Sequence, residues 1–361
     1  MQVLYYFQDI NTMIYQWQKY HIVDEMEKHN CFITILSPTY YGSVEQSNEA
    51  IVTAIKTNHY DLFMTCLTDK YLFPETIERI KEYGVPTLLF CPDNLTAPFN
   101  HKKIAYLFDL VWLTSKETEY LFRKWGSKTI FLPYAANPYF LIPRNDIKEE
   151  LSIGFIGTPH GSRIDRINFL QKQGISIAIH SKRSSIDSNL IKAPVRDYVR
   201  TFNAFMKYPI GRKLACAAII DKLAKRRLLE SEYLRVLEPV PLSDLASVNC
   251  KYALILSFTD ADSTGVLKHP VKIVNLRNFE IPMSGGIQFT LYSDELASYF
   301  EDDKEIIMGK TMEESADKAR FYLDEKRQKK RQEMRCAARK RAETEHTWYR
   351  RFSDIFTTIG I

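Results

Sequence analysis

Residues 271–286 bring two cations and a carboxylate close together in the sequence Val271-Lys-Ile-Val-Asn-Leu-Arg-Asn-Phe-Glu-Ile-Pro-Met-Ser-Gly-Gly286. The pattern predicts a loop that enters a short helix near position 276 and ends at the glycine pair. Free backbone N–H groups and the positive dipole end at such a helix start suit a diphosphate. Lys272 and Arg277 can bond to phosphate oxygens, and Glu280 can accept two ribose hydroxyls. The alternative is that Arg277 and Glu280 form an ion pair on the helix surface, worth about 0.2–0.5 kcal/mol.

A second candidate segment is the glycine-punctuated turn Ile153-Gly-Phe-Ile-Gly-Thr-Pro-His-Gly-Ser-Arg163. The pattern predicts a strand, a loop and then a helix, and the glycines let a ligand approach the backbone closely. The spacing matches neither the GxGxxG fingerprint of dinucleotide binding nor a phosphate loop that ends in GKS or GKT. His160 and Arg163 are candidates for contacts to phosphate or sugar. The alternative for His160 is an ordinary surface histidine.

Polar side chains that follow two expected strands of the N-terminal half are candidates for acid–base chemistry. Asp93 lies in Cys91-Pro-Asp-Asn94, just past the fourth strand, and Asp9 and Asn11 lie past the first. Open α/β sheets place ligand-facing residues at these carboxyl ends, and a carboxylate near a cleft can act as a general base. The alternative for Asp93 is an Asx turn that caps the next element.

Alternating apolar strands and amphipathic helices must position these residues. Across the first 145 residues the alternation is typical of a parallel sheet covered by helices. The expected strands are residues 3–7, 32–36, 62–66, 87–91, 110–113 and 129–132, and the expected helices are residues 13–27, 44–57, 74–83 and 116–125. The pattern therefore predicts a doubly wound α/β domain.

The alternation breaks in the charged, proline-containing connector Pro143-Arg-Asn-Asp-Ile-Lys-Glu-Glu150 and then restarts. We therefore predict an N-terminal domain at residues 1–147 and a second Rossmann-like domain at 148–345, which suits the length of the chain and implies a cleft. A Lys- and Arg-rich stretch of helical period, about 191–237, is interpreted as a helical insertion in the second domain. Residues 346–361 are expected to form an amphipathic helix that crosses back to the N-terminal domain.

The composition, with 45% hydrophobic and 26% charged residues, excludes a disordered or collagen-like chain. The start reaches Asp9 too early for the apolar core of a signal peptide, and no apolar run approaches the roughly 18 residues that span a bilayer. The cysteines at positions 31, 66, 91, 216, 250 and 336 form no CxxC pair. We therefore expect reduced, mostly buried thiols, no structural zinc and a cytoplasmic location.

The formal net charge is +5, and residues 318–341 are strongly basic. One interpretation is a solvated helical face. A second is attraction to anionic lipid headgroups at the inner face of the membrane, to which Lys222, Lys225, Arg226 and Arg227 would add. A third is nucleic-acid binding. No nucleic-acid partner is expected, because no helix-turn-helix, zinc finger or RNA-binding aromatic motif accompanies the charge.

Residues 275–351 resemble the C-terminal module of the glycosyltransferase family that includes spore-maturation (CgeB-like) proteins. In that family an R-x-F-E helix ending in Gly precedes a strand, a helix and a basic E-H-T-(W/Y)-x-x-R element. These parts here read Arg277-Asn-Phe-Glu280, Gly285-Gly286, Leu291-Tyr-Ser-Asp-Glu295 and Glu345-His-Thr-Trp-Tyr-Arg-Arg351. Three further segments are similar to that family: Leu132-Pro-Tyr-Ala-Ala-Asn137, Ile153-Gly-Phe-Ile-Gly157 with Arg163, and Pro239-Val-Pro-Leu-Ser-Asp-Leu245.

The resemblance implies a GT-B fold, in which two Rossmann-like, doubly wound α/β domains face a cleft. It implies that the second domain holds a nucleotide-sugar donor, that the acceptor is reached from the first, and that no metal or other cofactor is obligatory. By this resemblance Glu280 holds the ribose, while Lys272, Arg277 and the loop at Gly157 hold the diphosphate. The expected donor site is completed by Thr158, His160, Arg163, Asn275, Asn278 and Phe279, and Asp93, Lys272 and Arg277 form the expected catalytic set.

The expected function is therefore that of a hexosyltransferase-like enzyme in cell-surface glycan biosynthesis. It would move a sugar from a nucleotide-diphosphate sugar to a glycan, lipid-linked or protein acceptor, with cations stabilising the leaving diphosphate. A general base is needed only if the anomeric configuration inverts, and the residues leave both outcomes open. One alternative is a non-catalytic, two-lobed protein that binds nucleotide or glycan. The other, a nucleic-acid binder, would show steeply salt-dependent binding.

Overall fold

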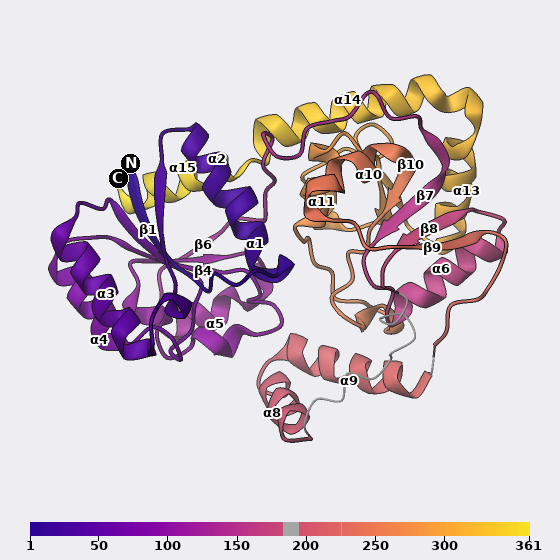
Figure 1. The fold of residues 1–361 in the computed structure, drawn as a ribbon. Helices are drawn as coiled ribbons and strands as arrows, with labels where there is room; N and C mark the ends of the chain where they lie inside the picture. The colour runs from indigo at the N-terminus through magenta and orange to yellow at the C-terminus, as the bar shows by residue number, and fades with distance from the viewer. Residues whose placement is uncertain (183–194, 225) are drawn as a thin grey trace. The chain divides into compact units, whose positions relative to one another are not determined.

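The computed structural model describes residues 1–182, 195–224 and 226–361, and the chain divides into two compact units (Figure 1). Unit 1 comprises Met1–Phe140 and Thr347–Ile361, and unit 2 comprises Leu141–His346. The division falls a few residues before the predicted boundary at 148 because the connector is bonded into unit 2. Arg339 Nη1 donates to the carbonyl of Leu141 at 2.7 Å, and Arg144 N donates to Cys250 Sγ at 3.3 Å.

Unit 1 contains a six-stranded parallel sheet in the order β2-β1-β3-β4-β5-β6. Its strands are β1 (Gln2–Tyr6), β2 (Phe32–Leu36), β3 (Leu62–Thr65), β4 (Thr87–Cys91), β5 (Leu110–Leu113) and β6 (Thr129–Phe131). Its helices are α1 (Met13–Gln18), α2 (Asp24–Lys28), α3 (Val44–Thr57), α4 (Pro74–Glu82), α5 (Glu119–Lys124) and α15 (Trp348–Ile359). Short helical turns are η1 (Lys19–Val23), η2 (Pro38–Tyr40), η3 (Pro98–His101), η4 (Ala105–Leu107) and η5 (Lys116–Thr118). The doubly wound pattern predicted for this region is confirmed.

The local sequence explains where these elements begin and which face they bury. The fully buried strand β3 reads Leu-Phe-Met-Thr, as a strand covered on both faces requires. Helix α3 begins after Ser43, whose Oγ accepts the N–H of Gln46 at 3.3 Å, and it buries Ile51 and Ile55 on one side. The helix predicted at 13–27 is divided by the π-helical turn η1, which buries three consecutive residues.

Helix α15 belongs to unit 1, although it is the last element of the chain. The ring of Trp348 is fully buried, and its centre lies 5.7 Å from that of Trp17 and 5.8 Å from that of Trp112. The guanidinium of Arg351 donates to the carbonyls of Pro133 and Tyr134 at 3.0 and 3.2 Å. These contacts make the final helix part of the core of unit 1.

Unit 2 contains a second six-stranded parallel sheet, in the order β12-β11-β10-β7-β8-β9. Its strands are β7 (Glu150–Ile156), β8 (Ile177–His180), β9 (Leu234–Leu237), β10 (Tyr252–Leu256), β11 (Gln288–Leu291) and β12 (Ile307–Gly309). Its helices are α6 (Ser162–Lys172), α8 (Val195–Phe205), α9 (Pro209–Ala224), α10 (Leu245–Lys251), α11 (Arg277–Met283), α12 (Asp294–Ala297), α13 (Met312–Leu323) and α14 (Gln328–Glu345). Short turns are η6 (Leu242–Asp244), η7 (Thr264–Val266) and η8 (Glu325–Arg327). The strand order reverses direction between the neighbouring strands β7 and β10, which makes this the switch point of the sheet.

The predicted insertion at 191–237 extends too far at its C-terminal end. Helices α8 and α9 are present, but residues 234–237 form strand β9, which pairs in parallel with β8 from Ile177 to His180. The short run Leu-Arg-Val-Leu contains too few residues to distinguish a strand from a helix by its period. Residues 191–194 and Lys225 of this segment lie outside the described residues.

Two further expectations from the sequence concern the burial of the cysteines and the length of apolar helices. Cys31, Cys91 and Cys250 are buried, Cys66 is half-buried, and Cys216 and Cys336 are exposed on helices α9 and α14, so burial holds for only part of the set. Within the described ranges, no helix combines the length and the apolar character that a bilayer span requires.

Candidate nucleotide site

The carboxyl ends of β7 and β10 lie side by side at the switch point of the unit 2 sheet, the position where open α/β sheets bind ligands. The glycine loop follows β7, and the long loop 257–276 follows β10 and leads to α11. Arg277, the first residue of α11, donates from Nη1 to the carbonyl of Ile156, the last residue of β7. The two segments singled out in the sequence therefore meet at one place in the fold.

Four cationic side chains gather at this edge. Arg163 and Arg166 come from the first turns of α6, and Lys272 and Arg277 come from the loop and helix after β10. Asp260, only 3% exposed, binds Lys272 Nζ through Oδ1 at 2.7 Å and Arg166 through Oδ2. This buried carboxylate holds two of the four cations in place.

Arg163 is the cation whose hydrogen bonding is incomplete. Its guanidinium lies 5.6 Å from the centre of the Phe258 ring, and its Nε is buried without a hydrogen-bond partner in the part of the chain that the structure describes. Burial lowers the pKa of Arg163, attraction to Asp262 opposes this, and the neighbouring Arg277 lowers the pKa further. An oxyanion bound here would satisfy the donor and reduce the repulsion between the guanidinium groups.

The loop after β7 contributes backbone groups to the candidate nucleotide site. Gly157 has φ = +136°, which side-chain-bearing residues rarely adopt, and its N–H donates to the carbonyl of His180 at 3.0 Å. Thr158 Oγ1 lies 3.3 Å from Ser181 Oγ. His160 is exposed, and its carbonyl accepts the N–H of Arg163 at 3.2 Å. The observed contacts of this loop are thus made mainly by backbone.

Glu280 is buried, with 4% exposure, at the side of α11 that carries Arg277. Arg277 Nε lies 3.7 Å from Glu280 Oε2. The ion pair considered from the sequence is therefore present, but its acid is not on the helix surface. A buried carboxylate beside a half-buried guanidinium can accept hydrogen bonds from hydroxyl groups.

The expected free amides at the start of α11 are occupied. Asn275 N donates to Asn278 Oδ1 at 2.8 Å, and Arg277 N donates to Asn275 Oδ1 at 3.0 Å. The expectation of free N–H groups is therefore wrong at these two positions, because neighbouring amide side chains cap them. The positive charge at this edge is therefore carried by side-chain cations.

Asn278 and Phe279 make packing contacts. Neither side chain is exposed to solvent. The Phe279 ring centre lies 5.1 Å from that of His346 and 5.7 Å from that of Tyr299, and Asn278 Nδ2 lies 3.4 Å from Ser257 Oγ. In the observed structure both residues hold α11 in position.

In unit 1, Asp93 is exposed in the turn after β4, and its carbonyl accepts the N–H groups of Thr96 and Ala97 at 3.2 and 2.9 Å. The neighbouring Asn94 is buried, and its Oδ1 accepts the N–H of Thr114 at 3.0 Å. Asp9, after β1, is paired with Lys19 at 2.7 Å.

Three site residues were not identified from the sequence: Arg166, Asp260 and Asp262. Arg166 lies three residues after Arg163, so both occupy one face of α6. Asp260 and Asp262 follow β10 closely, and the rule that selected Asp93 after its strand would also have selected them.

Comparison with known proteins gives a partial family match and a shared fold. Residues 212–357 match the family described as glycosyl transferase-like. No curated protein sequence matches the chain. Across 100% of this chain and 99% of that chain, the fold is similar to Anabaena HepE in complex with UDP and glucose, with 12% identity and a TM-score of 0.56.

Two further solved structures show the same fold. The sucrose-phosphate synthase of Thermosynechococcus elongatus has 10% identity and a TM-score of 0.55, with 99% of this chain and 99% of that chain covered. A glycosyltransferase of Rickettsia africae has 9% identity and a TM-score of 0.58, with 99% and 98% covered. The two six-stranded parallel sheets and these likenesses show that the chain has the GT-B fold, and its residues 212–357 match the glycosyl transferase-like family.

Proposed function

We propose that the protein transfers a hexose from a nucleotide-diphosphate sugar to a glycan, lipid-linked or protein acceptor. The observation that carries the proposal is the cluster of four cations at the switch point of unit 2, with the unpaired Nε of Arg163 among them. Proteins with a similar fold support a nucleotide sugar as the donor, since HepE has been solved with UDP and with UDP-glucose.

In the proposed reaction the donor diphosphate lies against Arg163, Lys272 and Arg277, beside the Gly157 loop. Negative charge develops on the diphosphate as its bond to the anomeric carbon breaks, and pre-positioned cations stabilise that charge. Asp260 keeps the ammonium of Lys272 in place before the donor arrives. We propose that these side chains supply the stabilisation without a metal ion or another cofactor.

Glu280 is proposed to accept the ribose hydroxyls of the donor. Its carboxylate is buried, so hydrogen bonds to it are not weakened by competing bulk water. Thr158 and His160 in the first loop, with Asn275 before α11, complete the proposed donor site. Asn278 and Phe279 contribute by holding α11 in place.

On the acceptor side, Asp93 remains the proposed general base. It is an exposed carboxylate at the carboxyl edge of the unit 1 sheet, a position from which a hydroxyl proton can be removed. This role applies if the transfer inverts the anomeric carbon.

We also propose that the protein belongs to the CgeB-like group and acts in cell-surface glycan biosynthesis, in the cytoplasm and peripherally at the inner face of the membrane. The R-x-F-E helix and the E-H-T-W element, both inside the matched range 212–357, support the first part. An anionic membrane surface is the proposed peripheral partner, supported by the basic segments of unit 2.

Nucleotide binding by paired variants tests the proposal. UDP, GDP and TDP are added separately, and the melting temperature is recorded for wild type, Glu280→Gln and Glu305→Gln. Glu305 is a matched control, because it is a buried glutamate of unit 2 that accepts the N–H of Glu301 at 2.8 Å. We expect one nucleotide to stabilise wild type and Glu305→Gln but not Glu280→Gln.

Turnover separates the enzyme from a binding protein. Nucleotide-diphosphate release from a panel of activated sugars is measured with and without acceptors from a cell extract. Release that requires an acceptor supports transfer, whereas binding without release would support the non-catalytic alternative. Failure of every nucleotide to bind would contradict both the transferase and a nucleotide-binding protein, and would leave glycan binding as the alternative.

A further inference from the structure

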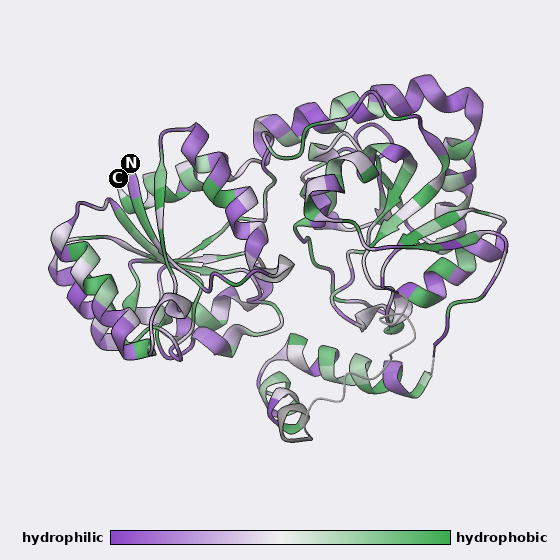
Figure 2. Cartoon of the chain, in the orientation of Figure 1, coloured by the Kyte–Doolittle hydropathy of each residue, from purple (hydrophilic) through white to green (hydrophobic). Residues whose placement is uncertain are grey.

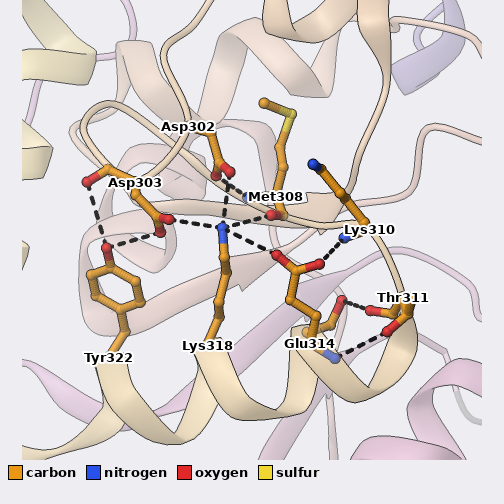
Figure 3. Close-up of polar contacts among 9 residues, drawn as sticks. Asp302, Asp303, Met308, Lys310, Thr311, Glu314, Lys318 and Tyr322 are labelled. Carbon is orange, nitrogen blue, oxygen red and sulfur yellow. Dashed lines mark hydrogen bonds and ion pairs between the residues drawn. The ribbon is translucent and has the colours of Figure 1, made fainter.

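Several cations of the basic C-terminal segment, residues 318–341, are paired inside unit 2, whereas Lys326, Arg327, Lys329 and Lys330 are exposed. Lys318 Nζ lies 2.9 Å from Asp302 Oδ2, 2.8 Å from Asp303 Oδ2 and 2.9 Å from the carbonyl of Met308, as Figure 3 shows. Asp303 also accepts the hydroxyl of Tyr322 at 3.1 Å. The charge of Lys318 is therefore neutralised within the fold and contributes little to a membrane surface.

Helix α14 uses its arginines in the same way. Arg331 is almost fully buried and binds Glu149 at 2.6 Å, and Arg335 binds the same carboxylate at 3.0 Å. Arg339 donates to the carbonyl of Leu141 at 2.7 Å. These three side chains, four residues apart, hold the connector onto unit 2.

The hairpin of α8 and α9 differs from this segment because it exposes apolar side chains. Figure 2 shows hydrophobic residues along α9. Helix α9 buries small residues and exposes large apolar ones. Its buried side contains Gly211, Leu214, Ala215 and Ala217. Ile219, Ile220 and Leu223 are 53%, 41% and 76% exposed.

The exposed apolar residues lie on one side of each helix. Cys216, Ile219, Ile220 and Leu223 are spaced by three or four residues on α9, so their side chains lie along one stripe. On α8, Val199 and Phe202 are exposed at the same spacing, and Met206 follows just after the helix. A helix at a protein surface normally buries its large apolar residues against the core of the domain. A stripe of such residues that stays exposed therefore indicates a contact surface.

Cations accompany this stripe. The hairpin, residues 195–224, contains Arg196, Arg200, Lys207, Arg212, Lys213 and Lys222 and two acids, Asp197 and Asp221. Asp221 is bonded within the unit, since Ser263 Oγ donates to Asp221 Oδ2 at 2.9 Å and Arg226 pairs with its other oxygen. Arg212 lies on the stripe itself, one helical turn before Cys216. An apolar face accompanied by more cations than acids is complementary to anionic lipid headgroups over acyl chains.

The hairpin is also fixed next to the candidate nucleotide site. Helix α9 packs on η7, the turn in the loop after β10 that also carries Asp260. The Ser263–Asp221 bond joins this loop to α9, and Arg226 joins Asp221 to Asp165 of α6. A surface held by the α8–α9 hairpin would therefore lie at a constant position relative to the donor site of unit 2.

We propose that the exposed stripe of α8 and α9, residues Val199, Phe202, Met206, Cys216, Ile219, Ile220 and Leu223, inserts into an anionic membrane surface while Arg212 and Lys213 contact its headgroups. The proposal names the element responsible for the membrane contact proposed above. It does not depend on sugar transfer, because lipid binding is measured without donor or acceptor.

Cosedimentation with vesicles tests it. The full chain is mixed with vesicles of phosphatidylcholine alone or of phosphatidylcholine with phosphatidylglycerol. We expect wild type to bind only the anionic vesicles. Arg212→Gln with Lys213→Gln should weaken binding about thirtyfold, given the contribution of each cation near a charged surface. Ile220→Ser with Leu223→Ser should weaken it about tenfold through lost apolar insertion.

Matched controls and folding checks accompany these variants. Ile142→Ser removes an apolar side chain that is 57% exposed elsewhere in unit 2, and Arg320→Gln removes a cation from α13. Both should bind as wild type does. Circular dichroism melting shows whether each hairpin variant is folded at the assay temperature.

Three results would overturn the proposal. One is failure of wild type to bind anionic vesicles at low salt. The second is equal binding by wild type and both hairpin variants. The third is a dimer, detected by light scattering, that the stripe substitutions dissociate while vesicle binding is absent, since the stripe would then cover a second copy of the chain.

Discussion

The two sheets share parallel topology but differ at their carboxyl edges. In unit 1, Asp9 pairs with Lys19 at 2.7 Å, and Asn94 is bonded to backbone and hydroxyl groups around it. In unit 2, Asp260 pairs with Lys272 at the same distance but shares the edge with three arginines, and the buried Nε of Arg163 has no partner among the described residues. At the edge of unit 1 Asp9 is paired with one lysine, whereas the edge of unit 2 gathers four cations around the buried Asp260.

This difference shows that doubly wound topology alone does not determine which ligand a sheet binds. Both sheets place loops at a switch point, between β1 and β3 in unit 1 and between β7 and β10 in unit 2. The residues that follow the strands decide whether that edge is neutral or cationic. Substitutions at each edge test whether the two edges differ in function as they differ in charge.

The largest effect is expected at the two aspartates that each pair with a lysine. Asp260→Asn leaves Arg166 and Lys272 without their buried partner and should reduce stability by about 3–5 kcal/mol, with loss of nucleotide binding. Asp9→Asn, at the more exposed pair in unit 1, should reduce stability by less than about 1 kcal/mol. Urea unfolding measures the stabilities, and isothermal titration measures nucleotide affinity. Equal losses in the two variants would remove the contrast between the edges.

Arg277→Ala tests the cationic edge without removing a buried acid. Loss of a cation that stabilises the leaving diphosphate should lower kcat by about 10²–10³-fold. Arg320→Ala is the control, because Arg320 pairs with Asp317 on the exposed side of α13. Steady-state transfer assays measure both variants. An Arg277→Ala enzyme with unchanged kcat would show that the cluster has a purely structural role.

Asp93→Asn tests whether the unit 1 edge contributes chemistry despite its balanced charges. If Asp93 removes the acceptor proton, kcat should fall about 10²-fold while donor affinity stays the same. Asp354→Asn, an exposed aspartate of α15 in unit 1, serves as the control. Retained transfer by Asp93→Asn would remove Asp93 from the catalytic set.

The smallest effect concerns the buried acid of unit 1, Glu25, which accepts the N–H of Tyr349 at 2.8 Å. Burial raises the pKa of Glu25 from 4.5 to about 7, although the hydrogen bond from Tyr349 lowers it. The folded pKa lies above the unfolded one, so the contribution of Glu25 to stability is full below about pH 4.5 and is lost as pH rises through 7.

Glu25→Gln should remove this dependence. Relative to wild type, the free energy of unfolding of the variant should rise by about 1 kcal/mol between pH 5 and pH 8, which is a few degrees in melting temperature. The gain is expected to be this small because the positive end of α15 offsets part of the cost of burying the Glu25 carboxylate. Thermal unfolding of both proteins across this pH range measures the difference. A constant gap between the two melting temperatures would show that Glu25 does not titrate there.

Much of the fold could be predicted because strands and helices have different apolar periods. The run Thr87–Cys91 and the amphipathic segment Val44–Thr57 have the predicted bounds in the structure. Strand β9 was assigned to the insertion and β12 was not predicted, because each contains only three or four residues and lies at a sheet edge. Short edge strands depend on a neighbouring strand more than on their own sequence.

The candidate site was predicted in part. The glycine loop and the stretch around Arg277 were identified, and the bond from Arg277 to Ile156 joins them. Asp260 and Arg166 were missed because their importance comes from one shared ion pair across two elements. The basic helix α14 was considered as a membrane surface, but Arg331 and Arg335 are bonded to Glu149, which lies far away in the sequence.

The sequence by itself determined the two α/β units, their helices and the residue types available for binding a diphosphate. These depend on local periodicity and on the chemistry of each side chain. Only the tertiary structure decided which charges are neutralised within the fold and which apolar residues stay exposed. The physical reason is that charge pairing and burial depend on distances between segments far apart in the chain, and parallel strands joined by helices bring such segments together.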